Sequence, residues 1–214
     1  MEKDFKYKKH SEAQVQRILD TAERLFIREG IGQVTISKIA RECNMSRATV
    51  YKYFHSVEQI LWEIHHVHMR TYGLELKKIL HIPGQTTYDQ IATYFTFLLD
   101  HFESDPSYYL FLDVFEKVYQ QDTTIGDYEM YKRVFRDDDF GSGDTVQILA
   151  KDFHDGSVHP ALDPISTCVS LVYSALSILN AMAKNSRYLP IKYATDALVL
   201  AKMSLKMLLE GIAP

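Results

Sequence analysis

The chain has few of the residues that mark specialised classes of protein. Its 214 residues include two cysteines, six prolines and nine glycines, too few for a disulfide-bonded scaffold, a collagen or a fully disordered chain. Neither Cys43 nor Cys168 belongs to a pair of zinc-binding spacing, so we expect both to be reduced core residues. No glycine-rich phosphate loop, HExxH or GxSxG motif is present, so we expect no enzyme and no cofactor.

Long hydrophobic runs are also scarce. Residues 1–11 are polar and lack the apolar core of a signal peptide. The stretch 165–183 has no charge, but four serines, a threonine and an asparagine lower its hydrophobicity. We therefore expect a buried interface helix in a cytoplasmic protein, with no membrane contact.

Charge is unevenly distributed. Residues 1–60 carry eleven Lys and Arg against eight Asp and Glu, whereas the remainder carries thirteen against twenty. A segment that suits a polyanion thus precedes an acidic body, although the excess alone decides nothing. Four lysines ahead of residue 11 would suit a phosphate-binding arm; a disordered, solvated tail is the alternative that we favour. These lysines are Lys3, Lys6, Lys8 and Lys9.

Apolar residues recur at helical spacing along nearly the whole chain, which predicts an all-α protein. The first helix should open at a capping box of Ser11 and Gln14 and end at Gly30. Short helices should follow from 36 to 43 and from 47 to about 54, and another capping box should open a longer one at Ser56. Further helices are expected over 87–103, 107–121, 127–137, 144–154, 164–185 and 191–211.

A tight turn separates the second and third predicted helices. Thr35 suits the N-cap of the second, Asn44 a left-handed turn position, and Ser46 the N-cap of the third. Two short helices joined in this way, braced by a preceding helix, are the elements of a helix-turn-helix unit. At 100° per residue, the third helix should turn Val50 and Phe54 inward.

The opposite face of the third helix carries a methyl, a hydroxyl, a phenol and an ammonium group, from Ala48, Thr49, Tyr51 and Lys52. Thr49 suits a base edge, whereas Tyr51 and Lys52 suit phosphate oxygens. Arg47 has the reach for a bidentate contact to guanine. Because such helix pairs also occur in proteins that do not bind DNA, a dimeric helical interaction module stays open as the alternative.

Two runs resemble the DNA-binding domain of the TetR/AcrR family of bacterial transcriptional regulators: ILDTAERLFIREG over 18–30 and TISKIARECNMSRATVYKYF over 35–54. A weaker resemblance, DGSVHPALDP over 155–164, is to the turn before the penultimate helix. The resemblance implies a three-helix helix-turn-helix domain over 11–71 and a helical effector-binding and dimerisation domain over 72–214. The implied function is sequence-specific transcription regulation, usually repression that a small molecule relieves.

The resemblance also implies contact residues. Tyr53 joins Thr49 and Tyr51 where family members touch DNA, and Ser37 and Lys38 lie where the second helix approaches the backbone. Asn44 departs from a usual glycine and Val57 from a frequent lysine. The complete predicted DNA-binding set is Thr35, Ser37, Lys38, Arg47, Ala48, Thr49, Tyr51, Lys52 and Tyr53.

The body of the chain should supply a dimer surface, because one recognition helix reads too few base pairs. In the family, the last two long helices of each subunit form a four-helix bundle; filling one subunit's core is the alternative. The predicted homodimer residues are Ser170, Leu171, Ser174, Ile178, Leu198 and Leu205.

Residues 94–140 hold thirteen of the twenty-six aromatic residues. Such residues suit a pocket for a small apolar or aromatic effector, which the corresponding helices enclose in TetR-like proteins; core packing is the alternative. The predicted pocket residues are Tyr94, Phe97, Tyr108, Phe111, Phe115 and Tyr119. His65 and His68 share a helical face but lack a third ligand, so no metal site is predicted.

Overall fold

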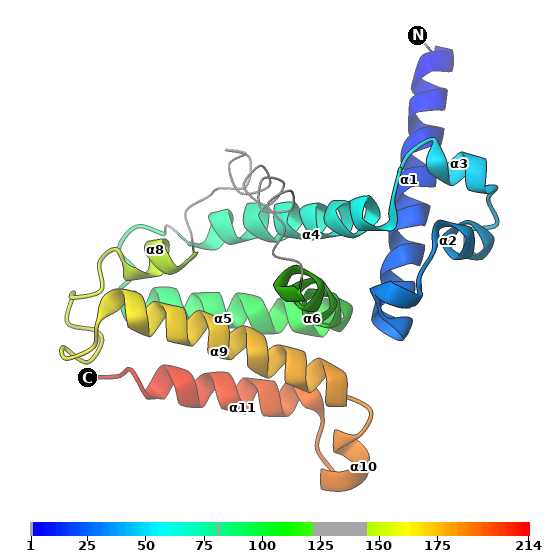
Figure 1. The fold of residues 1–214 in the computed structure, drawn as a ribbon. Coiled ribbons are helices and arrows are strands. Elements are labelled where there is room, and N and C mark those ends of the chain that lie inside the picture. The colour runs from blue at the N-terminus through cyan, green and yellow to red at the C-terminus, as the bar shows by residue number, and fades with distance from the viewer. Residues whose placement is uncertain (1, 81, 122–144) are drawn as a thin grey trace. The chain divides into compact units, whose positions relative to one another are not determined.

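The computed structural model describes residues 2–80, 82–121 and 145–214 (Figure 1). These residues divide into two compact units. The first unit contains the described residues of 2–68 and 111–121, and the second contains those of 69–110 and 145–214. Every regular element in these ranges is a helix, as predicted. The predicted helix over 127–137 lies outside the described residues.

The first unit is built on one long helix. Helix α1 (Glu2–Glu29) contacts the 3-10 turn η1 (Ile31–Gln33) and helix α2 (Ile36–Glu42), and α2 contacts α3 (Arg47–Tyr51). Helix α3 ends three residues before the predicted limit, and η1 was not predicted. Helices α4 (Val57–Ile79) and α6 (Pro106–Gln121) contribute residues to both units.

The predicted start of the first helix is wrong. Helix α1 begins at Glu2 rather than Ser11, so the segment expected as a solvated tail continues the helix. A capping box serves the free N–H groups of a helix start, and here those groups are bonded within the longer helix. Ser11 and Gln14 contact Tyr53 instead: the Tyr53 hydroxyl donates to Gln14 Oε1 at 2.7 Å and accepts from Ser11 Oγ at 3.4 Å.

The second unit consists of helices packed side by side (Figure 1). Helix α11 (Ala197–Glu210) contacts α5 (Thr87–Ser104) and α9 (Pro164–Asn185), and α8 (Thr145–Ala150) contacts both α5 and α9. The predicted helices over 87–103, 107–121 and 164–185 are confirmed within one residue at each end. Helix α8 is four residues shorter at its C-terminal end than the predicted 144–154.

The single helix predicted over 191–211 is wrong, because two helices occupy this range. Helix α10 (Leu189–Tyr193) ends where Ala194 adopts a left-handed conformation, with φ of 53°. Asp196 then caps α11 by accepting a hydrogen bond from the backbone N–H of Val199 at 2.8 Å. The N-cap residue Asp196 was the sequence signal for this break.

Helix α9 is, among the described residues, the one helix long and apolar enough to cross a membrane by length and composition. Asp163 caps it and Pro164 occupies its first turn, as suits a helix start. Its buried residues, Leu171, Ala175 and Leu179 among them, contribute to the core of the second unit. Cys168 in this helix and Cys43 in the first unit are both free and buried, as predicted.

A loop holds the start of α5 in place. Asp155 Oδ2 accepts from the backbone N–H of Thr87 at 2.6 Å, Ser157 Oγ accepts from the N–H of Tyr88 at 3.1 Å, and the Asp152 carbonyl accepts from the Thr87 hydroxyl at 2.9 Å. Burial alone would raise the pKa of the Asp155 carboxyl, but hydrogen bonds from Ser157 and Thr87 lower it below its usual value. Three hydrogen bonds therefore join the loop to α5, and the one to the Asp155 carboxylate is charge-assisted.

Replacing Asp155 with alanine is expected to lower the free energy of unfolding by about 1–2 kcal/mol at neutral pH, because Thr87 N–H loses a charged acceptor. The folded-state pKa of Asp155 is depressed, so this contribution is present above the unfolded-state pKa and disappears as the pH falls through the folded value. Urea denaturation at pH 7 and in acid measures both the loss of stability and its disappearance at low pH. Asp152→Ala, which keeps the backbone carbonyl, is the matched control; an equal loss there would contradict the assignment.

Candidate functional site

The third helix separates a buried face from an exposed one. Val50 is fully buried and Phe54, just beyond the helix, is 4% exposed, whereas Tyr51 is 50% exposed. Arg47 and Lys52 are also exposed. The inward and outward faces predicted for this helix are therefore confirmed, and the outward face carries groups able to donate hydrogen bonds to a polyanion.

The turn before this helix has the predicted local geometry. Asn44 is left-handed, with φ of 52°. Thr35 Oγ1 accepts from the N–H of Lys38 at 3.2 Å, and Ser46 Oγ accepts from the N–H of Thr49 at 3.0 Å. The Ser46 and Thr49 hydroxyls are also hydrogen-bonded to each other at 2.8 Å. Thr35 thus caps the start of α2 and Ser46 caps the start of α3, and the Thr49 methyl group stays outside the hydrogen-bond network.

Two further predicted contact residues come from the same region. Ser37 and Ala48 are exposed, one on α2 and the other on α3. Arg47 Nη1 approaches Ser37 Oγ at 3.5 Å, a long contact that leaves most of the guanidinium donors available. The structure thus brings the N-terminal parts of α2 and α3 to one exposed surface.

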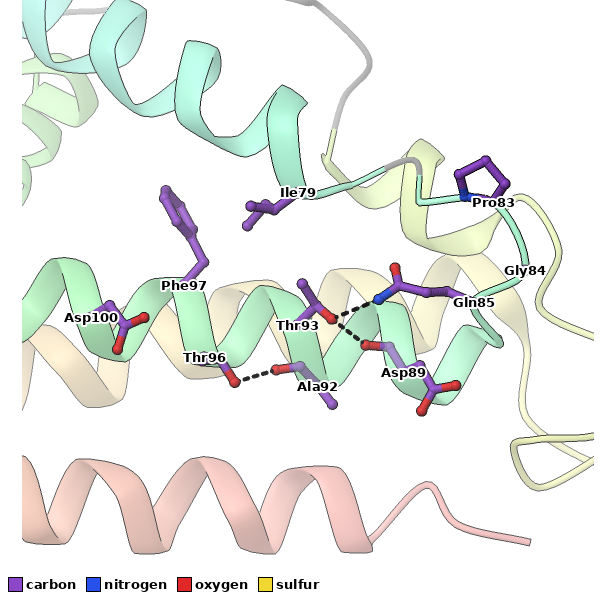
Figure 2. Close-up of a pocket in the computed structure, with 10 residues that line it drawn as sticks. All are labelled: Ile79, Pro83, Gly84, Gln85, Asp89, Ala92, Thr93, Thr96, Phe97 and Asp100. Atoms are coloured by element: carbon purple, nitrogen blue, oxygen red, sulfur yellow. Dashed lines mark hydrogen bonds between the residues drawn. The ribbon is translucent and has the colours of Figure 1, made fainter.

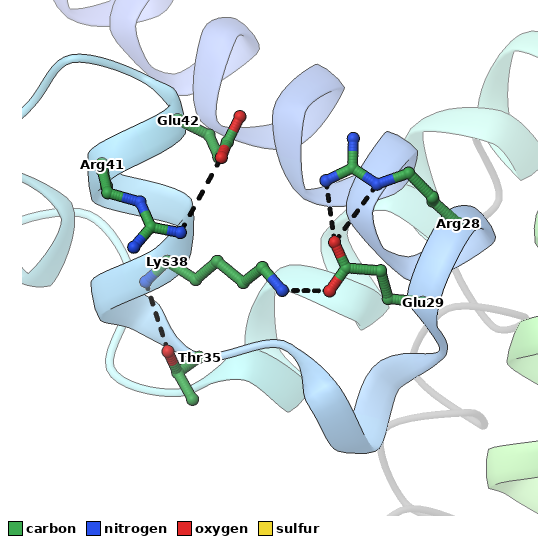
Figure 3. A network of polar contacts seen from close by, with 6 residues as sticks. All are labelled: Arg28, Glu29, Thr35, Lys38, Arg41 and Glu42. Carbon is green, nitrogen blue, oxygen red and sulfur yellow. Dashed lines mark hydrogen bonds and ion pairs between the residues drawn. The ribbon is translucent and has the colours of Figure 1, made fainter.

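Lys38 is held by an acidic partner. Figure 3 shows its ammonium group on one oxygen of Glu29, while Arg28 donates to the other oxygen at 2.7 and 3.2 Å. Hydrogen bonds from Lys38 first and Arg28 second hold the pKa of the Glu29 carboxyl below its usual value. A phosphate contact by Lys38 therefore requires exchange of this ion pair, a constraint that the sequence pattern did not indicate.

Tyr53 also has a partner within the protein, because its hydroxyl donates to Gln14 of α1. The side chain is half-buried, and the Lys52 ammonium lies 5.5 Å from the centre of its ring. Tyr53 thus links the residues that follow α3 to α1.

At the start of α4, Ser56 Oγ accepts from the N–H of Gln59 at 3.1 Å and Gln59 Oε1 accepts from the N–H of His55 at 2.7 Å, close to the predicted capping box.

The comparison with protein families identifies this segment. The sequence model of the family described as bacterial regulatory proteins, tetR family, matches residues 18–64, which include α2, the turn and α3. Residues 18–64 are thus similar to the helix-turn-helix domain of the TetR family. Over 73 residues it is 36% identical to an uncharacterized HTH-type transcriptional regulator of Mycobacterium tuberculosis, an alignment that covers 34% of this chain and 36% of that protein. The chain thus aligns with about a third of the length of this curated relative.

The TetR-type fold extends beyond the matched segment. FadR of Bacillus subtilis, solved in complex with stearoyl-CoA, aligns with 92% of this chain and 98% of its own at 16% identity, with a TM-score of 0.66. SmeT, the repressor of the SmeDEF multidrug efflux pump of Stenotrophomonas maltophilia, aligns with 94% and 90% at 19% identity, with a TM-score of 0.64. The fold is an N-terminal helix-turn-helix domain followed by a helical domain.

Two histidines of α4 have separate partners in the first unit. His65 is 5% exposed, and its ring stacks on Phe115 with centroids 3.8 Å apart. His68 Nε2 lies 2.7 Å from Glu23 Oε1 of α1. The two histidines therefore face different groups, although their spacing places them near one another on the helix.

Most of the predicted effector-pocket residues are core residues. Tyr94 and Tyr108 of the second unit are 1% and 3% exposed, and Phe111 and Phe115 of the first unit are 0% and 5% exposed. The Tyr94 hydroxyl accepts from Tyr72 at 3.2 Å, and burial raises the pKa of Tyr94 to about 12. For these four the structure supports the core-packing alternative, because their surfaces are already occupied. The Tyr119 side chain lies outside the described residues.

Phe97 is the predicted pocket residue that lines a described cavity. This cavity also contacts Asp89, Thr93, Thr96 and Asp100 of α5, none of which we predicted. Their spacing of four, three and four residues places them on one face of α5, so a polar helical stripe was the signal in the sequence.

The predicted dimer residues fall on both sides of their helices. Leu171 and Leu205 are 5% and 1% exposed, so they are corrected to core positions with little surface left for a partner. Ser170 is exposed, and Ser174, Ile178 and Leu198 are partly exposed. The large exposed apolar side chains on α9 and α11 are Ile165, Val169, Tyr173, Val199, Met203 and Met207.

Proposed function

We propose that this protein is a cytoplasmic, homodimeric, sequence-specific DNA-binding regulator of transcription, a repressor that a small-molecule effector releases from its operator. One observation carries the proposal: in the segment that matches the TetR family, α3 buries Val50 and Phe54 and exposes Tyr51 and Lys52. A short helix anchored in this way can enter the major groove with its free face.

The contacts divide by chemistry. Ala48 and the Thr49 methyl suit base edges, and Arg47 suits guanine. Tyr51 and Lys52 suit phosphates. Lys38 and Tyr53 are already bonded to Glu29 and Gln14, so we assign them a structural role beneath the DNA-contacting face of α3. Either side chain would contact DNA only after it leaves its present partner.

A second copy of the chain is the partner that the second unit would require. Val169 and Tyr173 are four residues apart on α9, and Val199, Met203 and Met207 follow the same spacing on α11. Exposed apolar stripes of this kind mark interaction surfaces, and a two-fold axis would bring two reading helices to neighbouring turns of DNA.

Release by an effector is a shift of population between two spacings of the reading helices. In one form of the dimer the two helices can reach both operator half-sites, and in the other they cannot. A ligand that binds the second form more tightly lowers the affinity for the operator, and the size of this effect is set by the difference between the ligand's affinities for the two forms. The complex of FadR with stearoyl-CoA supports a ligand site in this fold. We assign the regulatory ligand to the second unit.

Tyr51→Ala is expected to lower affinity for all duplexes by about tenfold, because a hydrogen bond to a charged phosphate is lost whatever the base sequence. Thr49→Ala should instead change the preference among sequences. Fluorescence anisotropy with a labelled duplex from the region upstream of the protein's own gene, and with shuffled duplexes, measures both effects.

Tyr193→Ala is the matched control for Tyr51→Ala, because Tyr193 is similarly exposed, at 59%, but lies on α10. Its DNA affinity should equal that of the unaltered protein. If the unaltered dimer binds no duplex from its upstream region at low salt, the protein is a helical interaction module and the proposal is wrong.

A further inference from the structure

A cavity of about 600 Å³ lies beside α5 in the second unit. Figure 2 shows Phe97 extending from α5 toward Ile79 at the end of α4, and Gln85 reaching from the preceding turn toward Thr93. The polar lining follows α5 from Asp89 in its first turn to Asp100. The cavity is thus a trough along one helix, with an apolar portion at Phe97 and Ile79.

The hydroxyl groups in this trough are available mainly as hydrogen-bond acceptors. Thr93 donates its proton to the Asp89 carbonyl at 2.8 Å, and Thr96 donates to the Ala92 carbonyl at 2.9 Å. The Gln85 amide nitrogen donates to Thr93 Oγ1 at 3.1 Å, while Gln85 Oε1 is buried and has no hydrogen-bond partner among the described residues. A hydroxyl oxygen whose proton is already donated can still accept a hydrogen bond. The polar lining of the cavity therefore suits a ligand that donates hydrogen bonds.

Carboxylates mark the two ends of the polar lining. Thr86 donates to Asp89 Oδ2 at 2.7 Å, which leaves Oδ1 available, and Asp100 has no partner among the residues that the structure describes. Eleven residues of helix separate them by roughly 16 Å, at about 1.5 Å per residue. Two carboxylates so far apart cannot share a metal ion, and the described lining includes no lysine or arginine to hold an anion.

We propose that this cavity binds an elongated organic dication, a diamine whose two ammonium groups reach Asp89 and Asp100 while its methylene chain lies along Phe97 and Ile79. The ammonium groups donate hydrogen bonds to Gln85 Oε1 and to the threonine hydroxyl oxygens, and the carboxylates carry the opposite charge. Binding at this site stands on the cavity itself; its role as the effector site rests on the proposed function.

Isothermal titration calorimetry with 1,12-diaminododecane tests the site, because the two nitrogens of this probe are separated by a comparable length of extended chain. We expect binding that weakens as NaCl is raised, since the charges are near solvent. Two probes serve as controls: 1,4-diaminobutane has the same charges but is too short, and 1,12-dodecanediol has the same length without charge. Both should bind at least tenfold more weakly. Equal binding of either control, or no binding of the long diamine, overturns the proposal.

Asp100→Asn should weaken binding of the long diamine about three- to tenfold, the range for a solvent-screened ion pair with a hydrogen bond. Glu103→Gln, also on α5 but outside the cavity lining, is the matched control and should bind as the unaltered protein does. Both exposed positions allow folding to be checked by circular dichroism. If Asp100→Asn binds the diamine as tightly as Glu103→Gln, the site is not the one proposed.

The role of the cavity as the effector site is tested separately, by the fluorescence anisotropy of a labelled operator duplex bound by the protein with and without 1,12-diaminododecane. A loss of DNA affinity that Asp100→Asn reduces supports the effector role. Diamine binding in the calorimeter without any change in DNA affinity keeps the site and overturns its role as effector. A protein that binds the diamine but no duplex overturns the proposed function and leaves the site established.

Discussion

Replacing Phe54 with alanine is expected to lower the free energy of unfolding of the helix-turn-helix unit by about 3–5 kcal/mol and to abolish operator binding. Phe54 is 4% exposed, and its backbone N–H donates to the Val50 carbonyl at 3.0 Å, directly behind the reading face. Removing a buried phenyl ring costs its transfer free energy and leaves a cavity. Because whole domains are stable by about 5–15 kcal/mol, this loss removes a large share of the total. Urea denaturation and anisotropy measure the two consequences.

Tyr51→Ala is the matched comparison, since it removes an aromatic side chain from the same helix at an exposed position. It should change stability by less than about 0.5 kcal/mol while lowering DNA affinity. The pair thus separates anchoring from contact. A larger loss of stability from Tyr51→Ala than from Phe54→Ala would reverse the assignment of inner and outer faces.

His65 is expected to make the helix-turn-helix unit acid-sensitive. Burial first, and the nearby charges of His68 and His66 second, lower the pKa of His65 from 6.5 to about 3. The folded state therefore excludes a proton that the unfolded chain accepts, so stability is full above pH 6.5 and falls as the pH is lowered toward 3. Between pH 7.5 and pH 5 this loss is on the order of 2 kcal/mol.

His65→Phe should remove this part of the pH dependence and stabilise the protein at both pH values. Phenylalanine keeps the stacking on Phe115, and it removes two buried ring nitrogens that have no hydrogen-bond partner in the described structure. Urea midpoints at pH 7.5 and 5 measure the effect, and His55→Gln, at an exposed position of the same unit, is the control. A pH dependence of equal size in His65→Phe and the unaltered protein would show that other groups cause it.

The features that were predictable from the sequence are those set by neighbours within one or two helical turns. The caps at Thr35 and Ser46, the left-handed Asn44 and the two faces of α3 all follow from local hydrogen bonds and helical period. The bounds of α5 and α9 follow from the same rules. The two wrong predictions of helix bounds also have local causes. The cap pattern at Ser11 lies within a longer helix, and the N-cap residue Asp196, which marks a break between two helices, was overlooked.

By itself, the sequence determined the all-helical fold, the helix-turn-helix unit and the side of its third helix that faces outward. Only the tertiary structure decided that Glu29 holds Lys38, that Gln14 holds Tyr53, and that Leu171 and Leu205 face inward. It also decided that one face of α5, rather than the aromatic cluster, lines the cavity. The physical reason is range: helical period and capping act over a few residues, whereas side-chain partners depend on which helices meet, and residues far apart in the chain determine that packing.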